Sequence, residues 1–127
     1  MKQSHVLQLA CEPLPIVRIG FIGLGNRGMA TLRRYLVIDG VEIVALCDIH
    51  RAHLDEASAV IAADGKYTPC LLNAQDGWKQ MCQRDDIDLI YICTDWLTHA
   101  PMACYAMEQG KHVAIEVPAA TTVEECW

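Results

Sequence analysis

The chain has 127 residues, of which 53% are hydrophobic and 20% charged, and its formal net charge at pH 7 is −6. This length suits one domain with a hydrophobic core and leaves no room for a second domain of ordinary size. The acidic balance, with a pI near 5.2, argues against a nucleic-acid partner or an anionic membrane surface. No apolar run approaches the ~20 residues of a transmembrane helix, so we expect no membrane partner.

Residues 1–15 read as a surface lead-in segment that Pro13 and Pro15 close. Their apolar patch is too short for a signal sequence, so we expect a cytoplasmic protein, with export of a full-length protein not excluded. The seven cysteines contain no C-x-x-C pair, and Cys82 and Cys104 lie on apolar helix faces. This pattern favours buried free thiols in a reducing compartment and predicts no metal site.

The stretch from residue 16 to residue 28, IVRIGFIGLGNRG, carries the strongest signal in the chain. Its apolar first half, interrupted only by Arg18, is typical of a parallel strand buried on both faces. Gly23, Gly25 and Gly28 follow in the spacing G-x-G-x-x-G, before an amphipathic helix over residues 29–37. Such glycines allow a tight turn, close approach of a pyrophosphate, and close packing of helix on strand. A structural turn without a ligand is the alternative interpretation.

A second strand-like run, residues 41–47, ends in Asp48, about 20 residues after Gly28. A carboxylate at this point is placed to accept a hydrogen bond from a ribose 2′-hydroxyl and to repel the additional phosphate of NADP. The sequence therefore predicts NAD as the cofactor, in preference to NADP. The alternative is that Asp48 caps the next helix.

Helices and strands alternate along the rest of the chain. We expect a helix over residues 51–63, a short edge strand at Tyr67-Thr68, a helix after Asp76 with Trp78 in the core, and a strand over residues 87–93. A helix with Pro101 in its first turn and Met107 facing inward should follow, then a strand over residues 112–117. Thr121 or Thr122, with Glu124 or Glu125, should form the capping box of a last helix.

This order predicts an α/β fold in which a doubly wound parallel sheet, ordered 3-2-1-4-5, lies between two helical layers. Ligands of such sheets bind at the carboxyl ends of the strands, where the order reverses. We therefore expect residues 16–127 to form an NAD-binding Rossmann domain. The last helix stops after one turn, so we expect a truncated chain from which a substrate domain is absent.

Four motifs resemble the NAD-binding domain of the glucose–fructose oxidoreductase and inositol dehydrogenase family (Gfo/Idh/MocA). They read GFIGLGNRG, ALCDI, CTDWLTHA and GKHVAIEVPAATTVEECW. Typical dehydrogenases of the family carry a lysine in an E-K-P motif, where it is implicated in proton handling, whereas this chain has Glu116-Val117-Pro118. The W-x-x-H turn, the E-V-P stretch and the N-R-G loop are similar to the NAD-dependent glycosidases of glycoside hydrolase family 109, typified by α-N-acetylgalactosaminidase.

The resemblance implies a set of residues that bind the cofactor. Asn26 and Arg27 would lie on it beside the three glycines, Asp48 on the adenosine ribose, the stretch Trp96, Leu97, Thr98 and His99 along the nicotinamide half, and Glu116 and Val117 near the nicotinamide ribose. The alternatives are that Arg27 is a solvated residue at the start of the helix and that Trp96 packs beside the crevice. No catalytic residue is identified: His99 is the one weak candidate, and it would equally serve as a helix cap.

The same resemblance implies hydrolysis through transient oxidation. NAD would take a hydride from the sugar C3 hydroxyl, a base would remove the C2 proton, the aglycone would leave, and water and the hydride would then add back. The expected partner is a small sugar or glycoside, with a homo-oligomer compatible with the family. Two other functions remain open: an NAD-dependent sugar or polyol dehydrogenase, and a nucleotide-binding module without catalysis.

Overall fold

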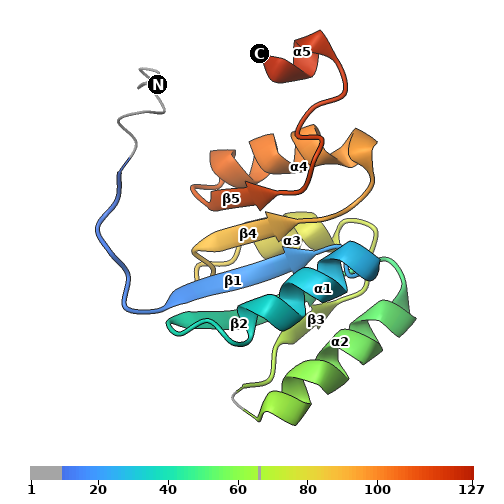
Figure 1. Cartoon of the computed structure of the whole chain (residues 1–127). Coiled ribbons are helices and arrows are strands. Elements are labelled where there is room, and N and C mark those ends of the chain that lie inside the picture. Colours follow the sequence, from blue (N-terminus) through green and yellow to red (C-terminus); the bar gives the residue numbers. More distant parts are fainter. Residues whose placement is uncertain (1–9, 66) are drawn as a thin grey trace.

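Five parallel strands form the centre of the protein in a computed structural model, which describes residues 10–65 and 67–127 (Figure 1). The sheet has the order β3-β2-β1-β4-β5. Its strands are β1 (Val17–Ile22), β2 (Val41–Cys47), β3 (Cys70–Leu72), β4 (Leu89–Ile92) and β5 (His112–Ile115). The predicted doubly wound sheet and its strand order are confirmed. Of the expected lead-in segment, residues 1–9 lie outside the described residues, and residues 10–15 are exposed.

Helices cover both faces of the sheet. Figure 1 shows α1 (Asn26–Tyr35) and α2 (Arg51–Asp64) on one face, with α3 (Gly77–Cys82) and α4 (Trp96–Glu108) on the other. The one-turn helix α5 (Val123–Cys126) lies beyond the β5 edge. Within the described ranges, no helix combines the length and apolarity needed to cross a bilayer.

Each face of the sheet has its own hydrophobic core. Phe21 of β1 packs under α1 and α2 with Tyr35 and Tyr91, at ring-centroid distances of 5.5 and 4.8 Å. The next residue, Ile22, belongs to the opposite core, where Met81 and the α3 and α4 side chains pack. Successive strand residues point to opposite faces, and here both faces are buried. This explains why β1 is apolar almost without interruption.

The one charged residue of β1, Arg18, fastens the amino end of the sheet. Its Nε and Nη2 atoms donate to the two carboxylate oxygens of Asp88, just before β4, at 2.9 and 2.7 Å. The hydrogen bonds from the Arg18 guanidinium hold the pKa of the Asp88 carboxyl below its usual value. Arg18 therefore joins the starts of β1 and β4, at the opposite end of the sheet from the glycine turn.

Several element boundaries differ from the sequence predictions: α1 begins at Asn26 and not at residue 29, and the edge strand and α4 also begin elsewhere. The edge strand is not Tyr67-Thr68 but β3, which follows Pro69 and pairs with Ala45–Cys47. A strand that starts after the proline keeps its backbone donors. Helix α4 begins at Trp96, so Pro101 lies inside it and not in its first turn. The reason is Asp95, whose Oδ1 accepts from the backbone N–H groups of Leu97 and Thr98 and so starts the helix early.

Three burial predictions are also corrected. Met107 is exposed, and Trp78 is only half-buried, packed against the core on the α3 and α4 face of the sheet. Cys47 and Cys82 are buried free thiols as expected, but Cys11, Cys104 and Cys126 are exposed.

At the last helix, the cap is Thr122: its Oγ1 accepts from Glu125 N–H at 3.1 Å, while Glu125 accepts from the backbone N–H of Thr121.

Candidate functional site

The glycine turn between β1 and α1 is built so tightly that two of its glycines admit no side chain. Gly23 has φ of +90°, and a Cβ there would lie 2.1 Å from the carbonyl oxygen of Cys93. A Cβ on Gly28 would lie 2.1 Å from the carbonyl oxygen of Gly23. Gly25 is different, because a Cβ there would meet no atom within 4 Å. Open space above Gly25 is the room that a ligand needs to reach the backbone.

Helix α1 starts at this open space without a side-chain cap. Its N-cap is Gly25, and Asn26 and Arg27 in its first turn are exposed. The first N–H groups of a helix carry a partial positive charge and have no partner within the helix. An uncapped helix end beside a side-chain-free backbone is suited to a phosphate or pyrophosphate.

Asp48 directly follows β2, next to the turn, and its carboxylate is held in one position. Oδ2 accepts from the backbone N–H of Leu24, inside the glycine turn, at 2.8 Å. Oδ1 accepts from the backbone N–H of His50 at 2.7 Å, and Nδ1 of His53 lies 3.0 Å from Oδ2. The Asp48 residue is only 9% exposed. The carboxylate thus joins the β1 turn to the start of α2.

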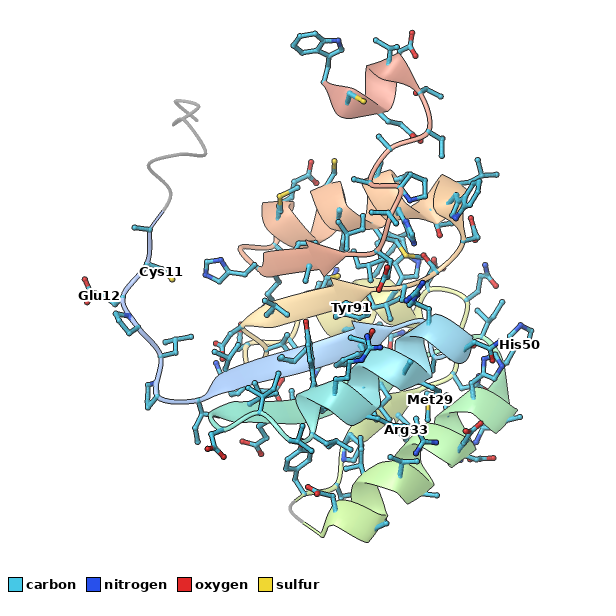
Figure 2. The ribbon with its side chains drawn as sticks, viewed as in Figure 1. Cys11, Glu12, Met29, Arg33, His50 and Tyr91 are labelled. Atoms are coloured by element: carbon cyan, nitrogen blue, oxygen red, sulfur yellow. The ribbon has the colours of Figure 1, made fainter. Side chains whose placement is uncertain are left out.

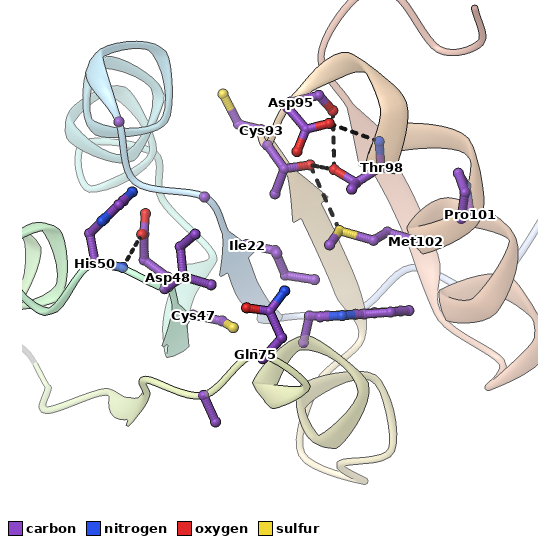
Figure 3. A pocket seen from close by; sticks show the side chains of 16 residues that line it. Ile22, Cys47, Asp48, His50, Gln75, Cys93, Asp95, Thr98, Pro101 and Met102 are labelled. Carbon is purple, nitrogen blue, oxygen red and sulfur yellow. Dashed lines mark hydrogen bonds between the residues drawn. The ribbon is translucent and has the colours of Figure 1, made fainter.

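A cavity of about 410 Å³ opens between these groups and α4 (Figure 3). Its walls come from the carboxyl ends of β1, β2 and β4, from the loop after β3, and from the first turns of α3 and α4. Lining residues include Gly23, Gly25, Asp48, His50, Gln75, Trp78, Cys93, Thr98 and Met102. Of the predicted site residues, four line this cavity: Gly23, Gly25, Asp48 and Thr98. Thr98 lies 2.7 Å from the Thr94 hydroxyl across the start of α4.

The other predicted residues of α4 lie outside the cavity lining. Trp96 and Leu97 are exposed on its first turn. His99 is 1% exposed: its Nδ1 lies 2.9 Å from the carbonyl oxygen of Pro118 and its Nε2 3.2 Å from that of Thr94. His99 thus links the chain after β4 to the chain after β5. Helix α4 is capped by Asp95, so His99 does not have the alternative role of helix cap.

Glu116 and Val117 follow β5 and differ in burial. Glu116 is half-buried, and its Oε1 accepts a 2.5 Å hydrogen bond from the hydroxyl of Tyr91, which also contacts Thr31 of α1. Burial and this hydrogen bond raise the pKa of the Tyr91 phenol. Figure 2 shows Tyr91 in the sheet beside α1. Val117 is 82% exposed, at the carboxyl edge of β5.

The thiols that line the cavity are not poised as nucleophiles. Burial raises the pKa of Cys47 to about 12, with a smaller contribution from Asp48. Burial also raises the pKa of Cys93, which Figure 3 shows at the end of β4. Both groups stay protonated near neutral pH. In the two described stretches, no group of three or more His, Cys, Asp or Glu side chains is arranged to hold a metal ion.

Several residues of the site escaped prediction from the sequence, among them Gln75, Trp78 and His53. Gln75 and Trp78 line the cavity because β3 ends at Leu72. Had the edge strand been placed after Pro69, the rule that ligands bind at strand ends would have selected them. His53 carried no signal, because its contact with Asp48 depends on where α2 begins.

These features together fit a dinucleotide. The open face of Gly25 and the uncapped α1 accommodate a pyrophosphate, and Asp48 offers an acceptor to an adenosine ribose. The cavity beside Asp48 has room for an adenosine half.

Comparisons with known proteins point the same way. Residues 17–127 match the model of a family described as "Oxidoreductase family, NAD-binding Rossmann fold". The chain is 64% identical over 125 residues to an α-N-acetylgalactosaminidase of Bacteroides fragilis, covering 98% of this chain and 29% of that protein. It is 48% identical to a family 109 glycosyl hydrolase of Phocaeicola vulgatus, covering all of this chain and 31% of that protein. The chain thus spans less than a third of the length of these relatives.

Solved structures of inositol dehydrogenases have the same fold. Myo-inositol dehydrogenase of Lactobacillus casei, in complex with NAD(H) and myo-inositol, has a TM-score of 0.73 at 27% identity, over 87% of this chain and 31% of that one. Myo-inositol 2-dehydrogenase of Lactobacillus plantarum has a TM-score of 0.75 at 28% identity, over 87% of this chain and 30% of that one.

Proposed function

The chain belongs to the Gfo/Idh/MocA oxidoreductase family and has its NAD-binding Rossmann fold, and we propose from this that it is the NAD-binding part of a glycosidase that acts through transient oxidation of its substrate. The proposed substrate is an α-N-acetylgalactosaminide or a related glycoside, as the name of the Bacteroides fragilis relative suggests. Bound NAD would accept a hydride from carbon C3 of the sugar, which oxidises the C3 hydroxyl to a ketone, and would later return it. The protein binds the cofactor and the substrate, orients them toward each other and shields them from water.

One residue carries the choice of reaction, namely Val117. It stands where typical dehydrogenases of the family carry the lysine implicated in proton handling, and its side chain cannot move a proton. Oxidation of the hydroxyl releases its proton in either reaction, so Val117 means that this chain must handle that proton by a route other than the lysine of the typical dehydrogenases. High exposure at the end of β5 means that packing does not require a valine here.

We propose a distribution of cofactor contacts along the carboxyl edge of the sheet. The pyrophosphate lies against Gly23, Gly25 and Gly28 and the first turn of α1, with Asn26 and Arg27 beside it. Asp48 accepts from the adenosine ribose. Trp96, Leu97 and Thr98 follow the nicotinamide half, and Glu116 and Val117 lie near its ribose. His99 has a positioning role, because both its ring nitrogens face backbone carbonyl oxygens.

We also propose a reducing compartment for the protein. Cys47 and Cys82 are free thiols buried in the core, and the chain contains no disulfide among its described cysteines. This composition is typical of proteins that are kept reduced.

The specific alternative is an NAD-dependent polyol dehydrogenase, which the inositol dehydrogenase structures favour. The test uses the complete gene product with chromogenic α-N-acetylgalactosaminides and related glycosides, while NADH is followed by its absorbance. We expect aglycone release without net NADH. NADH accumulation from free sugars or inositols, with no cleavage across the panel, would establish the dehydrogenase. Bound NAD with neither signal would leave a binding module without catalysis.

A further inference from the structure

The carboxylate of Asp48 has unusually full hydrogen bonding for a group that must also bind a ligand. A carboxylate accepts about four hydrogen bonds, two at each oxygen. Oδ2 has two partners, the Leu24 N–H at 2.8 Å and Nδ1 of His53 at 3.0 Å. Oδ1 has the His50 N–H at 2.7 Å. One acceptor position is therefore left, and it belongs to Oδ1.

Two of these three partners are backbone groups of the same turns that bring Asp48 to the cavity. His53 is the one side chain among them, and it lies in the first turn of α2, 39% exposed against 7% for the Asp48 side chain. Because a carboxylate oxygen can only accept, Nδ1 of His53 must carry the hydrogen in this contact. Neighbouring groups of either charge are exposed and paired with each other: Arg51 with Asp55, and Arg33 with Glu56.

We propose that His53 is a positioning residue of the cofactor site: its Nδ1–H occupies Oδ2 of Asp48, and so presents Oδ1 as the single acceptor for one hydroxyl of the adenosine ribose. Around metal sites, a second residue often donates a hydrogen bond to a metal-binding side chain and so fixes its orientation. His53 would act on the Asp48 carboxylate in the same way. Without His53, each carboxylate oxygen keeps one backbone donor and has one free acceptor position, so the carboxylate is held less tightly and the ribose can bind at either oxygen. Binding of the ribose must then order the carboxylate, and this reduces the favourable free energy of binding.

Binding to two cofactors separates this role from general support of the fold. We would measure NAD⁺ affinity of the 127-residue chain by calorimetry, together with the affinity for NAD⁺ lacking the 2′-hydroxyl of its adenosine ribose. His53→Ala should lower the affinity for NAD⁺ about five- to tenfold, and the affinity for the deoxy cofactor by less than about twofold. His53→Asn, whose amide nitrogen replaces Nδ1, should recover most of the NAD⁺ affinity. His112→Ala, an exposed histidine at the start of β5, is the matched control and should change neither.

Equal weakening of both cofactors by His53→Ala would overturn the proposal, because His53 would then act through the fold and not through the ribose acceptor. Unchanged NAD⁺ binding in His53→Ala, or no NAD⁺ binding by the unmutated chain, would overturn it as well. Nitrogen NMR of the histidine rings at about pH 8.5, where a free imidazole is neutral, gives a readout without cofactor. We expect the hydrogen of His53 on Nδ1, and a hydrogen on Nε2 alone would contradict the proposed contact. None of these results depends on glycoside cleavage, so they are independent of the reaction proposed above.

Discussion

The three glycines of the β1–α1 turn are under different constraints, which mutations can separate. Gly28 packs against the Gly23 carbonyl, whereas Gly25 faces open space and has φ of −68°, which other residues adopt freely. We expect Gly25→Val to fold normally and lose NAD⁺ binding, because its side chain takes the place of the pyrophosphate. Gly28→Ala should lower the free energy of unfolding by about 1 to 3 kcal/mol through overpacking. Thermal unfolding and calorimetry on both variants check this; NAD⁺ binding by folded Gly25→Val would mean that the turn is purely structural.

We expect the charge of Asp48 to decide the choice between NAD⁺ and NADP⁺. A carboxylate repels a 2′-phosphate, so the unmutated chain should prefer NAD⁺. We expect Asp48→Asn to weaken NAD⁺ binding by about 1 to 3 kcal/mol, because a charged hydrogen bond is lost. The difference in affinity between NAD⁺ and NADP⁺ should become smaller. Asn is preferable to Ala, since its amide oxygen still accepts from the buried Leu24 N–H. Asp55→Asn, at an exposed position of α2, is the control for the change of charge, and calorimetry with each cofactor gives the ratio of affinities. Equal affinities in the unmutated chain would refute this role.

For single residues, the sequence predicted a role correctly where the chemistry of the residue follows from its position in a motif. Spacing alone predicted the glycine turn and placed Asp48 at the edge of the cavity. It could not supply partners that depend on three-dimensional packing. Tyr91 reaches Glu116 and Thr31 only because β4, β5 and α1 meet on one face of the sheet.

Among the elements, the Arg18–Asp88 pair makes the stability of the sheet depend on pH. The pKa of Asp88 is lowered in the folded state, chiefly by its hydrogen bond with Arg18, from an ordinary value of 3.8. A carboxyl with a lowered folded pKa stabilises the fold above its unfolded pKa and loses this contribution as pH falls through the folded pKa.

We therefore expect Asp88→Asn to be less stable than the unmutated chain at pH 7, with the difference shrinking as the pH falls below about 4 and lost once the folded carboxyl is protonated as well. Urea unfolding across this range measures it. Asp85→Asn, an exposed neighbour, should behave like the unmutated chain. A difference that is constant with pH would show that the substitution acts by another route.

Element order was predictable because hydrophobic periodicity and turn residues are local properties. The boundaries that failed depended on information outside the local pattern. Tyr67 packs against the core under α1 and α2 and is not part of a strand, so its β-forming character misled the prediction. Helix α4 began early because the Asp95 cap outweighs the disruption expected from Pro101.

At the scale of the whole molecule, reversal of strand order between β1 and β4 brings separate segments to one edge of the sheet. The ends of β1, β2 and β4 reach the cavity, while the end of β5 carries Glu116 and Val117 alongside. The fold rule thus predicted where the site lies. It could not predict the reaction, because the same edge serves many chemistries. That choice depends on Val117 and on the longer relatives.

The reaction can be tested by where solvent hydrogen enters the product. In the proposed route the C2 proton is removed before the aglycone leaves, and the hydride taken from C3 is later returned. Hydrolysis by the complete gene product in D₂O should therefore give a sugar with deuterium at C2 and the original hydrogen at C3. Glycosidases that use two carboxylates across the bond leave C2 untouched. NMR of the product distinguishes them, and cleavage with no deuterium at C2 would exclude transient oxidation whatever the affinity for NAD⁺. A commercial two-carboxylate glycosidase on the same substrate is the control.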